Sequence, residues 1–456
     1  MTSILWVCFL SQVLASARGF FHPYPKINLG ERDGEDAGEP LFLTPFIERG
    51  DIAQGRQLAR VTLGKSLPVE SYAGYFTVNK TYDSNQFLWY FPSQAQDNGT
   101  SPVLVWMNGG PGASSLYGLF TENGPISVVN NTFRLREYHW ARNHHLIYID
   151  NPVGAGFSFT KNNNGYCTDE TQVGEQLYST LTQFFRLFPE LQQNKFFVSG
   201  ESYAGKYVPA LAYTIHKKNP TAETKINLQG IAIGDGWCDP EHQLVQSEYL
   251  YQIGLIDWNA KKRMKLHEDL AAKFLKNQQW MKASIELDKI TKDFPINIDV
   301  YNYMYLKTRQ DADFGSLIQQ SAFRKAIHVG EQPFHEFSFE ADVALSDDVL
   351  HSIAPWIAEL LDHYSVVIYN GQLDIIVAYP LTVNFLRNLK FSGADEYARA
   401  ERHPWMVGDE VAGYVKQAGR LTELLVRNAG HMVPADQPAW AWDMITRITH
   451  GQPFFD

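Results

Sequence analysis

Three residues far apart in the chain, Ser202, Asp374 and His431, have the side chains of a nucleophile, an acid and a base. A serine hydroxyl is a poor nucleophile at neutral or acidic pH, and it needs an imidazole to take its proton. The imidazole in turn needs a carboxylate, which holds its tautomer and stabilises the imidazolium. Taken singly, a serine after a strand usually caps a helix, and the other two are ordinary loop residues.

Ser202 stands in a segment suited to a sharp turn. The strand-like run Phe196–Ser199 precedes it, and the small residues Gly200, Ala204 and Gly205 surround it. Small residues allow the tight strand-to-helix bend that exposes a nucleophilic serine. The pattern G-x-S-x-G is met except at its last position, where Ala204 replaces glycine. The pattern alone is therefore weak evidence.

The elements that must position these residues are short, nearly continuous apolar runs rich in β-branched and aromatic residues. Such runs are typical of strands buried on both faces, which indicates a mostly parallel sheet covered by helices. The runs are Val103–Met107, Leu146–Ile149, Phe196–Ser199, Leu228–Ile233, Val366–Tyr369 and Leu424–Val426. A polar or glycine-rich tail follows each of them. Because ligands of open α/β sheets bind at the carboxyl ends of strands, we expect the chemistry along that edge.

Other segments predict the elements around this sheet. Val173–Leu187 carries apolar residues at helical spacing, and Tyr72–Val78 with Phe87–Phe91 predicts an antiparallel hairpin. Between residues 239 and 345 the pattern changes to charged helical segments: Trp258–Lys276, Trp280–Lys292 and Asp311–Val329. We expect residues 239–345 to form an inserted helical cap on a core made of residues 18–238 and 346–456. A separate second domain is less favoured, because strand-like sequence resumes at Ser365.

The three reactive residues coincide with this framework, since Asp374 and His431 each follow a predicted buried strand. Their chain order, Ser, Asp, His, is that of the α/β-hydrolases. We therefore expect an α/β-hydrolase fold with Ser202, Asp374 and His431 as a catalytic triad. The loop Asn108-Gly-Gly-Pro-Gly is similar to the loop that supplies an oxyanion donor in this fold, although a plain Gly-Pro turn has the same composition. The N–H groups of Gly110 and Tyr203 are the expected oxyanion hole.

Composition excludes several classes of protein. Of the 456 residues, 45% are hydrophobic and 20% charged, which fits a globular protein with a large core and excludes disorder, collagen and a coiled coil. The 39 Lys and Arg residues against 50 Asp and Glu give a formal net charge of −11. No basic run is long enough to follow a phosphate backbone, so nucleic acid is not an expected partner.

The N-terminus predicts entry into the secretory pathway. An apolar stretch ends in Ala15-Ser-Ala, which resembles a signal-peptidase site, so residues 1–17 are the expected signal peptide. No Lys or Arg precedes this stretch, which departs from the usual signal. A membrane anchor needs about 20 apolar residues, so no membrane span is expected. Sequons at Asn79, Asn98 and Asn130 predict N-glycans, and we expect a secreted or lysosomal protein.

Cysteine and histidine usage bears on covalent links and on metals. Cys8 lies in the expected signal peptide, which leaves Cys167 and Cys238 in the mature chain. A disulfide between them and two separate buried thiols both stay open, since the sequence does not show whether their Cα atoms lie within bridging distance. The sequence contains no CxxC pair and no HExxH, so we expect neither a metal nor another cofactor.

Five ordered motifs resemble those of the serine carboxypeptidases, and the resemblance covers nearly the whole mature chain. Five motifs in order are far more specific than one G-x-S-x-G. The motifs are Trp106-Met-Asn-Gly-Gly-Pro-Gly-Ala-Ser-Ser, Asp150-Asn-Pro-Val-Gly-Ala-Gly-Phe-Ser, Gly200-Glu-Ser-Tyr-Ala-Gly-Lys-Tyr-Val-Pro, Gly371-Gln-Leu-Asp and Gly430-His-Met-Val-Pro-Ala-Asp-Gln-Pro. Within the family, Ser71-Tyr-Ala-Gly-Tyr, Tyr251-Gln-Ile-Gly-Leu and Ala326-Ile-His-Val-Gly are most similar to the vitellogenic-like serine carboxypeptidases.

The resemblance implies a metal-independent enzyme that removes one residue at a time from the C-termini of peptides or proteins. It also implies that Asn108, the Gly109 backbone, Glu122 and Glu201 bind the terminal carboxylate of the substrate. Two ionised glutamates would repel that carboxylate. If Glu122 and Glu201 share a proton, the pair instead donates a hydrogen bond to it. Peptidase efficiency should then favour acidic pH and fall as the pair loses its proton.

Other functions stay open beside this one. An acyltransferase on the same scaffold would transfer the acyl group to a nucleophile other than water, although the full carboxylate-binding set argues against it. A binding or protective protein with little catalysis is a further alternative, against which the intact triad argues. Many family members have Cys where Ala113 stands and several disulfides, so their bridge pattern does not transfer here. The oligomeric state is also open, with a homodimer among the alternatives.

Overall fold

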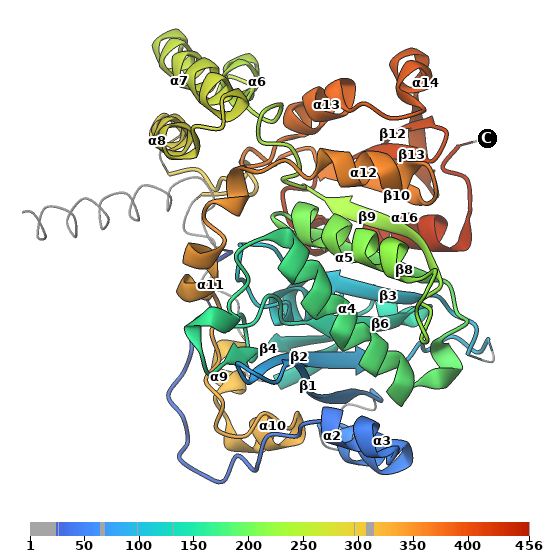
Figure 1. Cartoon of the computed structure of the whole chain (residues 1–456). Helices are drawn as coiled ribbons and strands as arrows, with labels where there is room; N and C mark the ends of the chain where they lie inside the picture. Colours follow the sequence, from blue (N-terminus) through green and yellow to red (C-terminus); the bar gives the residue numbers. More distant parts are fainter. Residues whose placement is uncertain are drawn as a thin grey trace, which may run out of the picture.

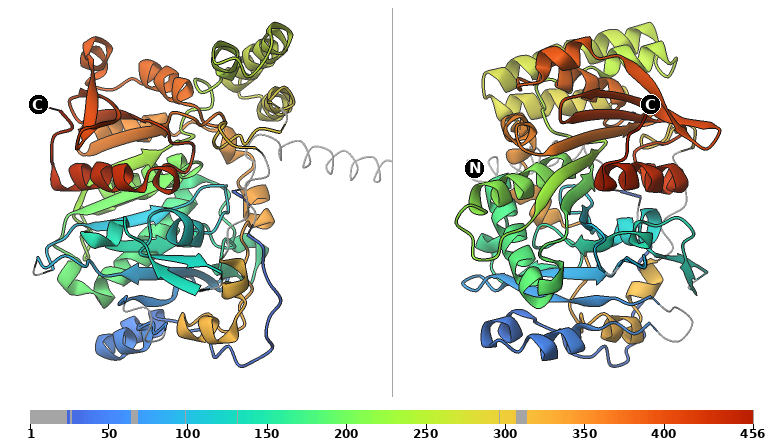
Figure 2. Two further views of the ribbon diagram at one scale, coloured as in Figure 1. Left: turned by 180° about the vertical axis from the view of Figure 1, so that it is seen from behind. Right: turned by 90° about the vertical axis from the view of Figure 1, so that its right-hand side faces the viewer.

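A computed structural model describes residues 24–25, 27–63, 69–97, 99–130, 132–295, 297–306 and 314–455. The expected signal peptide and Asn98 lie outside these ranges. Within them a sheet of 11 strands runs through the molecule in the order β1-β2-β6-β3-β8-β9-β10-β13-β12-β11, with β7 beside β2 (Figure 1, Figure 2). The fold is that of an α/β-hydrolase, as expected.

The six strands from β6 to β13 in this order are parallel, which confirms the interpretation of the apolar runs. Every predicted strand is present, and all but β3 extend by one to three residues beyond the predicted limits. Their bounds are β3 (Val103–Met107), β6 (His145–Ile149), β8 (Phe196–Glu201), β9 (Leu228–Gly234), β10 (Ser365–Gly371) and β13 (Leu421–Val426).

Antiparallel strands complete both edges of the sheet. β1 (Tyr72–Asn79) and β2 (Ser84–Phe91) form the predicted hairpin, and β7 (Phe159–Thr160) also pairs with β2. At the opposite edge, β12 (Glu410–Ala418) and β11 (Arg402–Val407) were not predicted. Both strands are partly exposed and carry polar residues, so they lack a continuous apolar run. β4 (Ile126–Val129) and β5 (Thr132–Leu135) form a separate small sheet.

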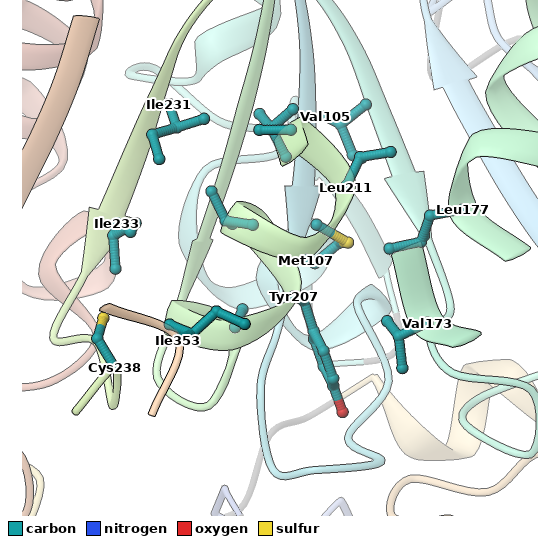
Figure 3. Close-up of a cluster of buried hydrophobic side chains, with 14 of the residues drawn as sticks. Val105, Met107, Val173, Leu177, Tyr207, Leu211, Ile231, Ile233, Cys238 and Ile353 are labelled. Atoms are coloured by element: carbon teal, nitrogen blue, oxygen red, sulfur yellow. The ribbon is translucent and has the colours of Figure 1, made fainter. Parts of the chain in front are cut away.

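Successive side chains of the central strands enter two different cores. Val105 and Met107 of β3 lie against the face covered by α4 (Glu170–Leu187) and α5 (Ala204–Lys218), as Figure 3 shows. Trp106 enters the core on the opposite face, which includes the buried side of α16 (Pro438–His450). Both faces are therefore buried, which is why the strands are apolar without alternation.

The helix α4 illustrates how the local sequence forms these elements. Its N-cap residue, Asp169, accepts a hydrogen bond from the N–H of Gln172 at 2.9 Å, which satisfies one of the unpaired N–H groups of the first turn. Val173, Leu177, Leu181 and the paired residues Phe184 and Phe185 are buried along one side. The helix ends at Leu187, just before Pro189.

The chain between β9 and β10 contains residues 239–345, which the sequence predicts to form an inserted cap. Its helices α7 and α8 match the predicted ones and stand with α6 at the upper left of Figure 1. The region 311–329 contains two short helices in its described part, α9 and α10. In Figure 1, α9 lies with α11 on the left side, and α10 lies at the bottom of the view. The bounds are α6 (Gln246–Gln252), α7 (Trp258–Lys276), α8 (Trp280–Thr291), α9 (Gly315–Ile318), α10 (Ser321–Ala326), α11 (Phe339–Ala344) and α12 (Ala354–Leu361).

The other helical elements are short or peripheral. One of them, the single π-helical turn η1, lies close to the carboxyl end of β3. They are α2 (Thr44–Arg49), α3 (Ile52–Ala59), α13 (Tyr379–Asn388), α14 (Ala394–Arg399), α15 (Val433–Asp436), η1 (Gly118–Glu122), η2 (Trp140–Arg142), η3 (Asn163–Gly165), η4 (Pro189–Leu191) and η5 (Asp348–Leu350). No helix in the described ranges is long and apolar enough to cross a membrane.

The cysteines and two of the sequons lie in described parts of the chain. Cys167 and Cys238 are separate buried thiols, which excludes the alternative of a disulfide between them, and burial raises the pKa of both. Asn130 is exposed in the turn between β4 and β5. Asn79 ends β1, and its side-chain oxygen accepts from the N–H of Thr81 at 2.9 Å. Glycosylation of these asparagines stays a prediction.

Candidate active site

Ser202 forms a sharp elbow between β8, which ends at Glu201, and α5, which begins at Ala204. Its φ angle is 97°, a left-handed conformation that costs a non-glycine residue about 1–3 kcal/mol. Backbone hydrogen bonds hold this conformation. The Ser202 N–H donates to the Gly234 oxygen at 3.1 Å, and the Ser202 oxygen accepts from Gly205 and Trp237, each at 2.9 Å. This is the strand-turn-helix geometry of a nucleophilic serine.

The glycines near the elbow are required by close approach. A Cβ on Gly200 would lie 2.5 Å from the Met107 oxygen and 2.7 Å from the Ala204 Cβ. A methyl group at position 204 is therefore accommodated only because Gly200 has no side chain. A Cβ on Gly109 would lie 2.4 Å from the Tyr203 nitrogen, so the loop after β3 presses directly against the elbow.

His431 and Asp374 are joined directly. The His431 Nδ1–H donates to Asp374 Oδ2 at 2.8 Å, and both side chains are almost completely buried. Asp374 also accepts from the N–H of Ile376 at 2.8 Å and of Val377 at 3.2 Å, which holds the carboxylate in place. The predicted cap segment also contacts the histidine loop, because the His431 N–H donates to the Tyr301 oxygen at 2.6 Å. The Nε2 atom is left as the base.

The topology brings the three predicted triad residues to one edge. Ser202 follows β8, Asp374 follows β10 and His431 follows β13, and these parallel strands, with β9 between β8 and β10, run side by side. Within the described ranges, however, no hydrogen bond joins the Ser202 hydroxyl to His431. In enzymes without substrate this bond is often long and tightens only when substrate binds. The structure thus contains the His431–Asp374 hydrogen bond of the predicted triad.

The predicted oxyanion donors also lie on touching segments. Tyr203 follows Ser202 directly, and Gly110 follows Gly109, where an added Cβ would lie 2.4 Å from the Tyr203 nitrogen. Gly110 has a φ of 112°, a conformation that suits glycine. The loop is braced by the Ala113 N–H, which donates to the Gly109 oxygen at 3.1 Å, and by the Gly112 N–H, which donates to the Tyr207 hydroxyl at 3.2 Å.

The four residues implied in carboxylate binding form one buried cluster. Asn108 Nδ2 donates to Glu122 Oε1 at 2.9 Å and to Glu201 Oε1 at 3.2 Å. Its own oxygen accepts from Trp106 Nε1 at 2.9 Å and from the Gly118 N–H at 3.0 Å, which fixes the orientation of the amide. The π-helical turn η1 carries Glu122 to this place.

The two glutamates are buried side by side. Burial raises the pKa of Glu122 to about 7, while the amide of Asn108 opposes this rise. Burial and the charge of Glu122 raise the pKa of Glu201 well above its usual range. Two adjacent carboxyl groups without a cation between them cannot both ionise cheaply. The pair therefore holds a proton at acidic pH and can offer it to an acceptor.

Three further residues belong to this site and were not predicted from the sequence. Tyr24 accepts a hydrogen bond from the Gly109 N–H at 3.0 Å. Asp235 lies beside Asp374 and accepts from the Gly371 N–H at 2.9 Å. Tyr301 contributes its backbone oxygen to His431. The position of Asp235 at the end of a buried strand was a usable signal, whereas Tyr24 and Tyr301 stand in segments without a recognisable pattern.

The same region contains a group of side chains that a metal ion could use. One ligand atom from each of Asp235, Asp374 and His431 lies within 4.8 Å of the others. The His431 Nδ1–H and backbone N–H groups already donate to these carboxylates. Donated protons point at the oxygens that would face a cation, so the arrangement fits a hydrogen-bonded triad better than a metal centre.

The fold and the elbow define an α/β-hydrolase with a serine nucleophile. A family model described as serine carboxypeptidase matches residues 62–451. The chain therefore belongs to the serine carboxypeptidase family, and it is a serine-type carboxypeptidase, as the motifs predicted.

Relatives of this family match the chain almost from end to end. A venom serine carboxypeptidase of Apis mellifera is 49% identical over 97% of each chain. A vitellogenic carboxypeptidase of Aedes aegypti is 49% identical over 94% of each, and the human probable serine carboxypeptidase CPVL is 43% identical over 99% of this chain and 98% of its own. The crystal structure of a Kex1 prohormone-processing carboxypeptidase from Saccharomyces cerevisiae shares the fold, with a TM-score of 0.74 and 22% identity over 87% of this chain and 96% of its own.

Proposed function

We propose that the Ser202 hydroxyl attacks the carbonyl carbon of the last peptide bond while His431 Nε2 takes its proton. The N–H groups of Gly110 and Tyr203 stabilise the oxyanion, and each donor contributes on the order of 3–4 kcal/mol at such a site. His431 then gives the proton to the leaving amine. An acyl-enzyme remains on Ser202, and water releases it by the reverse sequence. Asp374 keeps the imidazole in the required tautomer throughout.

The cluster around Asn108 is the observation that supports an exopeptidase. Glu201 is the residue directly before the nucleophile, so a carboxylate held by Asn108, the Gly109 N–H and the glutamate pair lies next to the scissile bond. Because the carboxylate-binding groups lie next to Ser202, there is room for only one residue between the cleaved bond and the terminal carboxylate. Without it the same triad would serve an esterase or an endopeptidase equally well.

Acidic conditions suit this reaction, because the glutamate pair must hold a proton to bind an anion. The predicted signal peptide and sequons agree with a secretory-pathway location, secreted or lysosomal. The relatives named for venom and for vitellogenesis support the secretory pathway in a more general way.

Mass spectrometry of a peptide mixture tests the reaction. The chain and its Ser202→Ala variant are incubated with the mixture at pH 5, together with a set of peptides whose C-termini are amidated. We expect stepwise shortening from free C-termini by the unchanged chain alone, and little or no cleavage of the amidated set. Internal cleavage would count against an exopeptidase. Transfer of the acyl group to added amines in preference to water would favour the acyltransferase alternative.

A further inference from the structure

Asp235 occupies a central place that the triad does not account for. It follows β9, which lies between β8 with the nucleophile and β10 with the loop to Asp374. The residue is completely buried, and its N–H donates to the Tyr369 oxygen at 2.8 Å. One carboxyl oxygen, Oδ1, accepts from the Gly371 N–H at 2.9 Å and from Asn370 Nδ2 at 3.3 Å.

The other oxygen of Asp235, Oδ2, is buried and receives no hydrogen bond from an N–H or hydroxyl group in the described part of the chain. It stands in the group in which one atom each of Asp235, Asp374 and His431 lie within 4.8 Å. Burial first, and then the charge of Asp374, raises the pKa of Asp235 well above its usual range. Two neighbouring buried carboxyl groups retain one proton between them.

We propose that Asp235 carries this proton and donates it as a hydrogen bond to Asp374, acting as a positioning residue for the triad. The neutral acid leaves Asp374 as the single negative charge opposite the Nδ1–H of His431. It also adds a side-chain hydrogen bond to the backbone N–H groups of Ile376 and Val377 that hold the Asp374 carboxylate. The other ionisable groups around Asp235 are Glu201 and Tyr369.

The substitution Asp235→Asn tests this assignment. An asparagine keeps the oxygen that accepts from Gly371 and places an N–H where the acid has its O–H, so it imitates the protonated form at every pH. We expect Asp235→Asn to retain kcat within about threefold, and Asp235→Ala to lose about tenfold or more in kcat with little change in KM. If Asp235→Asn loses as much as Asp235→Ala, the ionised form is the functional one and the proposal is wrong.

The pH profile separates positioning from a purely structural role. The measured quantity is the rate at which a fluorophosphonate labels Ser202, since this probe needs the triad but no terminal carboxylate. We expect the labelling rate of the wild-type protein to change above the pH at which Asp235 loses its proton. The pH profile of Asp235→Asn should lack this change. Identical profiles, or loss of labelling on addition of EDTA, would overturn the proposal. Because no peptide is involved, these outcomes do not depend on carboxypeptidase activity.

A different observation concerns Tyr24 in the N-terminal segment. Its hydroxyl accepts from the Gly109 N–H at 3.0 Å, the group assigned above to the substrate carboxylate. Its ring centroid lies 5.1 Å from that of Tyr117, 6.5 Å from that of Tyr301 and 6.4 Å from that of His431. Burial, and then the charges of Glu201 and Glu122, raise the pKa of this phenol well above its usual value. A polar oxygen of the chain thus sits among the carboxylate-binding groups.

The residues after Tyr24 are fastened to the inserted segment. The Ile27 N–H donates to Glu336 Oε2 at 2.6 Å, and the Ser321 N–H donates to Asp33 Oδ2 at 2.9 Å. Lys325 and Asp36 form an exposed ion pair at 2.7 Å. Exposed pairs of this kind contribute little, because water and salt screen the two charges. These contacts hold the N-terminal segment, residues 24–25 and 27–36, in place beside the site. Residues 31–36 are all exposed and are therefore accessible to proteases.

We infer that Tyr24 is an internal occupant of the carboxylate site and that the N-terminal segment inhibits the enzyme until it moves or is cut. The inference rests on the proposed function, because it identifies the Gly109 N–H with substrate binding. A peptide carboxylate and the phenol cannot both accept from one N–H at full strength. Occupancy by Tyr24 therefore competes with substrate and acts mainly on KM.

The variants Tyr24→Ala and Tyr24→Phe test this inference. We expect Tyr24→Ala to raise kcat/KM for a peptide about fivefold or more, mainly through a lower KM, and Tyr24→Phe to raise it less. Tyr414→Ala, which removes an exposed tyrosine on β12, is the matched control and should leave kcat/KM unchanged. Unchanged or lower kcat/KM in Tyr24→Ala and Tyr24→Phe would show that Tyr24 supports the site or is irrelevant to it.

A second experiment avoids any failure of these variants to fold. A specific protease site inserted between Gly34 and Glu35 allows the segment to be cut after the chain has folded. We expect peptidase activity to rise with the extent of cutting, and a synthetic peptide of residues 18–34 to inhibit the cut enzyme competitively. Activity that stays constant or falls on cutting would refute the inference. If cutting speeds fluorophosphonate labelling but no peptide is shortened, occlusion by Tyr24 stands and the carboxypeptidase assignment fails.

Discussion

Replacing Glu201 by glutamine tests how an acidic site binds an anion. The Glu122 and Glu201 carboxyl groups share the amide of Asn108, and the second oxygen of each glutamate is buried without an N–H or hydroxyl partner in the described part of the chain. The pKa of Glu122 is raised to about 7, chiefly by burial. Below that pH Glu122 is protonated and the pair can donate a hydrogen bond to the substrate carboxylate, and above it Glu122 carries a negative charge that repels the substrate.

The size of the effect follows from this pKa. If kcat/KM for a peptide is proportional to the fraction of Glu122 that is protonated, this fraction is about 99% at pH 5 and about 9% at pH 8. We therefore expect kcat/KM to fall roughly tenfold between these two pH values through this pair alone. A glutamine at position 201 keeps an N–H donor at every pH and removes one of the two carboxyl charges, so the alkaline fall should be smaller in Glu201→Gln.

The assay is kcat/KM for an N-blocked dipeptide with a free carboxylate, measured from pH 5 to pH 8.5. Glu122→Gln is the matched variant, because it also leaves a single carboxyl group in the cluster. The fluorophosphonate labelling rate of Ser202, measured on the same samples, corrects for any pH effect on the triad. An alkaline limb for peptide hydrolysis that is unchanged in Glu201→Gln would refute the shared proton.

The remaining predictions concern stability and the catalytic groups. Because the pKa of Glu122 rises from 4.5 to about 7 on folding, the folded chain binds the proton more tightly than the unfolded chain, so the free energy of unfolding should fall as pH rises through this window. Urea titrations at pH 5 and pH 8 measure the fall, and an equal fall in Glu122→Gln would assign it to other groups. Asp374→Asn should lower kcat by about 10⁴-fold with little change in unfolding, since the imidazole would take the wrong tautomer; a loss under tenfold would contradict the triad. Gly109→Ala places a Cβ 2.4 Å from the Tyr203 nitrogen and should reduce kcat/KM by about 100-fold or more through the displaced oxyanion donors, and wild-type kinetics would refute the assigned geometry. Leu181→Ala, at a completely buried position of α4, should cost about 2–5 kcal/mol in urea unfolding and leave kcat unchanged in the folded enzyme; a cost under about 1 kcal/mol would mean that the core closes over the missing side chain.

The sequence predicted well those elements whose burial dictates their composition. The parallel strands β3, β6, β8, β9, β10 and β13 are apolar on both sides because two cores enclose them, so a simple run of apolar residues marks each one. β11 and β12 were missed for the complementary reason. Strands that are partly exposed need no continuous apolar run, and nothing else in their sequence distinguishes them from loops.

Some features of the candidate site could likewise be predicted from the sequence, whereas others could not. The residue types after each strand are local features, and the order of Ser202, Asp374 and His431 is read directly from the chain. The sequence alone was therefore enough to predict the α/β-hydrolase fold, the strand-to-helix turn at Ser202 and the family. Whether Cys167 and Cys238 are bonded depends on the distance between two segments that are far apart in the chain, and only the structure answers it.

The sequence by itself determined which backbone segments become strands and which residue types stand at their ends, because periodicity and turn chemistry act over a few neighbouring residues. Tertiary structure alone decided that Glu122 and Glu201 both accept from Asn108. It also placed Asp235 beside Asp374, and the Tyr24 hydroxyl where it accepts from the Gly109 N–H. The charge and proton state of a carboxyl group depend on which groups surround it after folding. Those neighbours come from distant parts of the chain, so no local pattern specifies them.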